Sequence, residues 1–139
     1  MSAESPLGHY QAVNAYGAVA GDRVQLILKM MNAAVDRIVT AKGYVRRREI
    51  AAKGQTISGA IGIIEGLRAA LNRDQGGAIA QNLDGLYDYM TRRLVQANLK
   101  DDERLLDEVA ELLNELRSGW EAISREPAAI GPGAGTAGG

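Results

Sequence analysis

The hydrophobic residues of this chain recur every three or four positions over four successive stretches, a spacing that places them on one face of an α-helix. The stretches cover residues 22–43, 46–72, 76–99 and 103–125. The last has the most regular repeat: Leu106, Val109, Leu113, Leu116, Trp120 and Ile123. Proline occurs only at positions 6, 127 and 132, so no proline interrupts the four stretches. The pattern predicts an all-α fold.

The connections between the stretches indicate how the helices are arranged. Asp22 is a candidate N-cap and Gly43 a candidate C′ residue of the first helix. The second helix carries four interior glycines, each costing about 1 kcal/mol relative to alanine. Helices of similar length with short connections favour an antiparallel, up-down four-helix bundle over residues 22–125.

The two ends of the chain differ from this central domain. Residues 1–21 have a weaker apolar pattern, and we expect a short helical or extended cap segment there. Residues 126–139 consist mainly of glycine, alanine and proline. Such a segment buries too little apolar surface to offset its ordering entropy, so we expect a flexible tail.

Composition excludes several classes of function. The chain has no cysteine and one histidine, His9, so a disulfide framework, a zinc ribbon and a histidine-rich metal site are not expected. The net charge is −1, which gives no global attraction to nucleic acid. No apolar run is long enough for membrane insertion, and residues 1–6 lack the positive region and apolar stretch expected of a signal peptide. We therefore expect a cytoplasmic protein without catalytic, cofactor-binding or metal-binding residues.

Two charged clusters are candidate carriers of chemistry. Asp84 and Asp88 lie four residues apart on one helical face and are the basis of a rival hypothesis, a small enzyme or metal carrier. An ordinary surface ion pair between Asp88 and Arg92 is favoured instead. The basic run at residues 46–48 is expected to be a solvated surface, with contact to phosphate or an acidic partner as the alternative.

Apolar residues outside the main stripes indicate a surface for protein interaction. The first helix has a wide apolar arc that includes Met30, off the main stripe. Tyr87 and Tyr89 lie on different faces of the third helix, so at least one is expected near the surface, where tyrosine is a candidate interface anchor. From the residues alone the chain is a helical interaction module, with a homodimeric scaffold or adaptor as one alternative.

The third helix carries a specific motif. The run Gly76-Gly77-Ala78-Ile79-Ala80-Gln81-Asn82-Leu83-Asp84-Gly85-Leu86-Tyr87-Asp88-Tyr89-Met90 continues through Thr91-Arg92-Arg93-Leu94. Together with the later segments 97–100 and 112–117 and Trp120, it closely resembles the flagellar secretion chaperone FliS family. The resemblance covers roughly residues 10–123. The family often has Ala-Ser-Pro before the first helix, where this chain has Val19-Ala20-Gly21, and Tyr-Asp within it, where this chain has Lys29-Met30.

The resemblance implies a cytoplasmic chaperone. It would bind the disordered C-terminal region of flagellin in apolar surface grooves, prevent premature polymerisation and deliver the client to the flagellar type III export apparatus. Further partners implied by the resemblance are export gate components, an anti-sigma factor or another flagellin-binding regulator. The chain itself would be a monomer or weak homodimer.

Flagellin-binding candidates come from three parts of the chain. The resemblance makes Tyr10 the match for a tyrosine that covers one groove when flagellin is absent, with Tyr16 as a substitute. Glycines on the second helix would let a client backbone approach, with Ile57, Ile61 and Ile64 as apolar walls. The third-helix motif contributes Tyr87, Tyr89 and Arg93.

Overall fold

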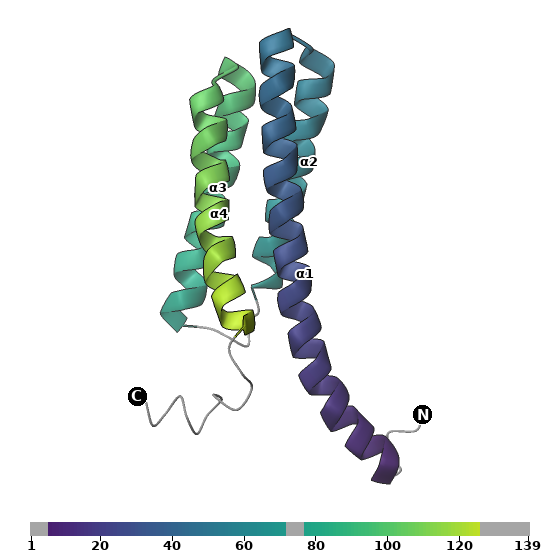
Figure 1. Cartoon of the computed structure of the whole chain (residues 1–139). Helices are drawn as coiled ribbons and strands as arrows, with labels where there is room; N and C mark the ends of the chain where they lie inside the picture. Colours follow the sequence, from purple (N-terminus) through teal and green to yellow (C-terminus); the bar gives the residue numbers. More distant parts are fainter. Residues whose placement is uncertain (1–5, 72–76, 126–139) are drawn as a thin grey trace.

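The computed structural model contains four α-helices. It describes the backbone of residues 6–71 and 77–125, and the side chains of residues 21–71 and 77–122. The helices are α1 (Pro6–Arg47), α2 (Ile50–Ala70), α3 (Gly77–Lys100) and α4 (Glu103–Arg125). Consecutive helices run antiparallel, with the α1–α2 and α3–α4 turns together at one end (Figure 1). The predicted all-α four-helix bundle is confirmed.

Each helix packs against two neighbours around a shared core. α1 packs against α2 and α4, and α3 packs less extensively against the same two helices. The core contains buried residues from every helix, and the largest are Tyr87, Met31, Ile38, Ile57, Ile64, Met90, Leu94, Leu106, Leu113 and Val109. Aliphatic residues and methionine fill most of it, as the composition predicts, and Tyr87 is its buried aromatic residue.

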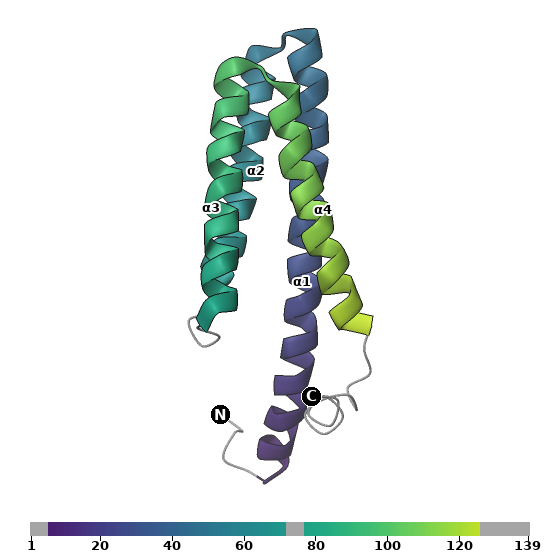
Figure 2. The ribbon, with the colours of Figure 1, turned by 90° about the vertical axis from the view of Figure 1, so that its left-hand side faces the viewer.

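The first helix differs from the sequence-based expectation. α1 begins at Pro6 rather than at residue 22 and continues to Arg47, so Asp22 is not an N-cap and Gly43 is not a C′ residue. Proline at a first helical position is favourable, and no later proline interrupts the segment. The first part of α1 extends past the ends of the other helices instead of folding back along the bundle (Figures 1 and 2).

Both short turns end a helix with a residue in the left-handed region. Arg48 has φ 58° and Asp101 has φ 51°. After α1, the Glu49 amide donates to the Tyr44 carbonyl (3.0 Å) and the Arg48 amide to that of Val45 (3.1 Å). This is a Schellman motif, in which glycine is the usual residue at the left-handed position. The turns are therefore tight, but they use side-chain-bearing residues where glycine would fit with less strain.

Candidate functional site

α3 carries the motif, and its side chains divide over three directions. Tyr87, Met90, Leu94 and Ala97 face the core. On one flank Asp84 and Asp88 face α2, and on the other Tyr89 and Arg93 face α4. The helix positions these groups because residues three, four or seven apart share a face. The motif is thus split between the core and two polar junctions, which we name the α2–α3 clasp and the α3–α4 clasp.

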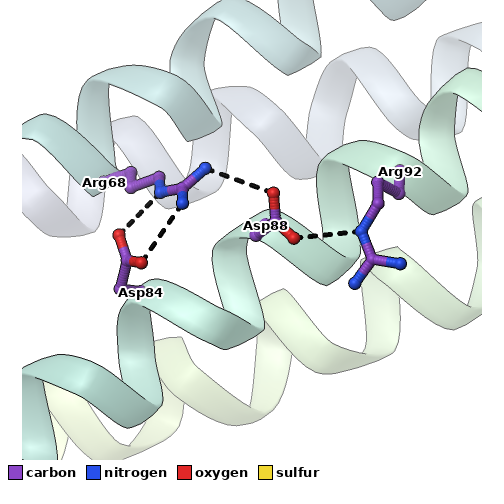
Figure 3. Close-up of polar contacts among 4 residues, drawn as sticks. All are labelled: Arg68, Asp84, Asp88 and Arg92. Atoms are coloured by element: carbon purple, nitrogen blue, oxygen red, sulfur yellow. Dashed lines mark hydrogen bonds and ion pairs between the residues drawn. The ribbon is translucent and has the colours of Figure 1, made fainter.

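The α2–α3 clasp is centred on Arg68 (Figure 3). Its Nε and Nη2 atoms donate to the two carboxylate oxygens of Asp84 at 2.6 and 3.2 Å, and its Nη1 donates to Asp88 at 3.3 Å. Asp88 also accepts from Arg92 Nε at 3.0 Å, which confirms the predicted ion pair. The hydrogen bond from Arg68 lowers the pKa of Asp84 below its usual 3.8. The two carboxylates are neutralised by arginines and serve as a link between helices.

The α3–α4 clasp is centred on Glu108. This carboxylate accepts hydrogen bonds from the Tyr89 hydroxyl and from Arg93 Nε, the latter at 2.9 Å. The Arg93 guanidinium also lies over the Tyr89 ring, 5.5 Å from its centroid. The pKa of Glu108 is lowered chiefly by its hydrogen bond with Tyr89 and next by its hydrogen bond with Arg93. The hydrogen bond between Tyr89 and Glu108 also raises the pKa of Tyr89. Both motif residues are therefore engaged within the chain.

Several large apolar side chains of α3 stay on the surface. Ile79 is 76% exposed, Leu99 is 77% exposed and Val95 is 44% exposed. A monomer gains nothing in stability from apolar side chains that remain in contact with water. Single exposed apolar residues are common, but several on one helix suggest a surface for a partner.

The predicted binding residues occupy different environments. Ile57, Ile64 and Tyr87 are at most 2% exposed, so they cannot touch a partner in this conformation. Ile61 is partly buried against the core, and Tyr89 and Arg93 lie in the α3–α4 clasp. Tyr10 and Tyr16 fall in the first part of α1, and their side chains lie outside the described residues.

The glycines of α2 are not equivalent. A Cβ at Gly59 would lie 2.7 Å from an Arg37 nitrogen, and one at Gly66 would lie 3.0 Å from the terminal carbon of Met30. These two glycines let side chains of α1 lie close to α2. A Cβ at Gly62 would meet no atom within 4 Å, so of these three it alone faces open space.

Sequence reasoning missed three residues that join the helices: Lys53, Arg68 and Glu108. Lys53 had a detectable signal, because it shares the helical face of Ile57, Ala60 and Ile64 and is buried with them. Arg68 and Glu108 had no such signal. Their partners are 16 residues away (Arg68 to Asp84) and 15 residues away (Glu108 to Arg93) along the chain, and the pairing depends on how helices align.

The described residues also bear on metal binding and membrane insertion. Within the described ranges, no three or more His, Cys, Asp or Glu side chains form a group that could hold a metal ion. Over residues 6–71 and 77–125, no helix is long and apolar enough to cross a membrane.

A small antiparallel bundle with helix-linking clasps and uncovered apolar side chains fits the class of helical proteins that bind other proteins. The family model for the flagellar protein FliS matches residues 7–127. Flagellar secretion chaperone FliSB of Pseudomonas aeruginosa is 45% identical over 125 residues, which cover 89% of this chain and 99% of that protein. Flagellar secretion chaperone FliS of Salmonella typhimurium is 44% identical over 101 residues, 72% of this chain and 75% of that one. The Bacillus subtilis protein of the same name is 32% identical over 127 residues, 91% of this chain and 92% of that one.

The chain belongs to the FliS family of flagellar proteins. These curated relatives are all named flagellar secretion chaperones.

Proposed function

We propose that this chain acts in the cytosol as an export chaperone for flagellin. It would bind the disordered C-terminal region of flagellin, prevent polymerisation and deliver the client to the flagellar export apparatus. The observation that carries the proposal is the family match over residues 7–127, together with relatives named flagellar secretion chaperones. Export gate components, an anti-sigma factor or a flagellin-binding regulator are further partners that the family resemblance suggests.

The surface of α3 supports this proposal. Val95 and Leu99 lie four residues apart and so share a face of the helix, where both are exposed. An amphipathic client helix anchors itself through apolar residues at such spacings. Ordering a disordered client costs roughly 2–5 kcal/mol of the gross interaction energy. This cost lowers the net affinity and so favours release of the client without ATP hydrolysis.

The buried candidates take a supporting role in the proposal. Ile57, Ile64 and Tyr87 would maintain the bundle, whereas Ile61, Tyr89 and Arg93 reach the surface and would contact the client. Tyr10 and Tyr16 remain candidate contacts on the part of α1 that extends past the bundle.

Calorimetry with a flagellin C-terminal peptide tests the proposal. We expect the full chain to bind this peptide. We expect no binding of a flagellin that lacks its C-terminal segment. The double variant Val95→Gln, Leu99→Gln should bind at least tenfold more weakly, whereas Val39→Gln, a control at an exposed α1 residue, should bind normally. A seeded polymerisation assay should show that the chain keeps flagellin monomeric.

The homodimeric scaffold is the competing outcome of the same experiment. Light scattering of the chain with and without the peptide distinguishes the two. A dimer that is unaffected by the peptide would support the scaffold and contradict the chaperone proposal.

A further inference from the structure

A hollow of about 510 Å³ lies beside the α1–α2 turn and reaches the α3–α4 turn. Both turns lie at the same end of the bundle (Figure 1). Tyr44, Arg48 and Ile50 line it from the first turn, and Asp101 lines it from the second. The first part of α1 extends from the opposite end (Figure 2), so the hollow is far from the segment that carries Tyr10 and Tyr16.

The acidic groups of the hollow are already paired. Glu49 accepts from Arg47 Nε at 2.7 Å, and Asp101 accepts from the Lys53 ammonium. Arg48 also lines the hollow, and among the described residues no ion pair or hydrogen bond of its side chain is found. The hollow therefore offers a guanidinium that is free to pair with a carboxylate from another molecule.

The backbone of Arg48 adds a second observation. Its φ of 58° places it in the left-handed region at the end of α1, where an L-residue is strained and glycine is not. An arginine at this position lowers stability but places a guanidinium beside the hollow. Residues held in sparsely populated backbone regions are often found at functional sites.

Ile50 supplies an apolar wall. It is the first residue of α2 and lies in line with the core-facing residues, yet it is 72% exposed because the bundle ends there. Tyr44 faces the same hollow and is stacked under the Arg47 guanidinium, 5.3 Å from its ring centroid. The hollow thus combines an apolar wall with an unpaired guanidinium.

We propose that this hollow is a docking site for a short acidic segment of a partner protein. An apolar side chain of that segment packs against Ile50 and Tyr44, and an adjacent carboxylate pairs with Arg48. Guanidinium and carboxylate form two parallel hydrogen bonds, which fixes the orientation of the segment as well as its charge. The site is centred on Arg48 and Ile50 of the α1–α2 turn, and it approaches the α3 face proposed for flagellin only at Asp101, two residues beyond Leu99.

Fluorescence anisotropy with a labelled eight-residue peptide of alternating leucine and glutamate tests the proposal. Matched peptides replace either every glutamate with glutamine or every leucine with serine. We expect the first peptide to bind at least tenfold more tightly than either matched peptide. On binding, the amide resonances of Ile50 and Asp101 should shift. Equal binding of all three peptides, or shifts confined to other residues, would overturn the proposal.

Variants of Arg48 test whether the peptide binds at the hollow. Arg48→Glu should weaken the peptide at least tenfold, whereas Lys29→Glu, the same charge change at an exposed α1 residue away from the hollow, should not. Arg48→Gly suits the positive φ and should fold at least as well as the natural chain, so weaker binding by this variant cannot come from unfolding. Equal loss in Arg48→Glu and Lys29→Glu would show nonspecific electrostatics and overturn the proposal.

Two further measurements test whether the hollow is distinct from the flagellin site and whether it recognises more than negative charge. Flagellin peptide binding should be unchanged in Arg48→Glu, and its loss would mean that the hollow is part of the flagellin site. An eight-residue oligothymidylate tests for recognition of negative charge alone. If it binds as tightly as the peptide and depends on Arg48, the protein-segment proposal is wrong.

Discussion

The Lys53 ammonium on α2 donates a hydrogen bond of 2.9 Å to the Asn98 carbonyl, in the last turn of α3. Lys53 is 7% exposed, and its ammonium also pairs with Asp101, the left-handed residue that ends α3. The last carbonyls of a helix have no partners within the helix and carry partial negative charge. A buried cation from a neighbouring helix therefore caps α3 and joins it to α2.

Lys53→Met removes this cap while keeping most of the side-chain volume. We expect the free energy of unfolding to fall by about 1–3 kcal/mol, because the Asn98 carbonyl loses a charged donor. Urea unfolding at neutral pH measures the change. Lys42→Met is the matched control: its ion pair with Asp107 (2.7 Å) lies nearer the surface and should be worth less than about 1 kcal/mol. Equal losses in both variants would contradict the capping role.

Arg48→Gly should have the opposite effect on stability. Glycine adopts the positive φ of this position without the steric cost that arginine bears, so we expect a gain of about 1 kcal/mol. Arg47→Gly, one residue earlier, should destabilise, because Arg47 is helical, pairs with Glu49 and lies over Tyr44. Thermal unfolding of the two variants measures whether each one gains or loses stability relative to the natural chain. A loss of stability in Arg48→Gly would show that its side chain stabilises the turn.

The fold could be predicted from the sequence further than the site could. Periodicity defines which residues of a helix face inward, and it correctly placed Leu106, Val109 and Leu113 in the core. The start of α1 was missed because its first part has only a weak apolar pattern. The clasps depend on side chains that meet only after the helices align, so neither Arg68 with Asp84 nor Glu108 with Tyr89 was predictable.

Gly62→Ala tests whether the packing of α2 requires a residue without a side chain at position 62. A Cβ there meets no atom within 4 Å, so alanine should stabilise the helix by about 0.5–1 kcal/mol. Gly66→Ala should gain less, because the terminal carbon of Met30 must shift from a position 3.0 Å from the new Cβ. Chemical denaturation of the pair measures both. If Gly62→Leu keeps the fold and still binds the flagellin peptide normally, Gly62 is not part of a client groove.

The α3–α4 clasp should make stability depend on acid pH. The pKa of Glu108 in the folded state lies below its usual 4.5, chiefly through the hydrogen bond from Tyr89. A carboxylate with a lowered pKa contributes stability that is present above its unfolded pKa and lost as the pH falls through its folded pKa. Tyr89→Phe removes the main cause, so it should destabilise most at neutral pH and progressively less below about pH 4.5.

Urea unfolding at several pH values measures this dependence. Tyr44→Phe is the control, since Tyr44 is stacked with an arginine, Arg47, whereas Tyr89 is hydrogen-bonded to a carboxylate. Its effect should be the same at neutral and acid pH. A Tyr89→Phe effect that is equally independent of pH would show that Glu108 draws no stability from Tyr89.

Tyr87 should make the free energy of unfolding depend on alkaline pH. Burial raises the pKa of its phenol from 10.0 to about 12. Between these values the unfolded chain loses the proton and the folded chain keeps it, so stability falls by about 1.4 kcal/mol per pH unit. Tyr87→Phe has no proton to lose, and other titrating groups are common to both proteins. The natural chain should therefore lose about 2 kcal/mol relative to Tyr87→Phe between about pH 9 and pH 11.5. A constant difference in unfolding free energy over this range would show that the phenol ionises as readily in the folded chain as in the unfolded one.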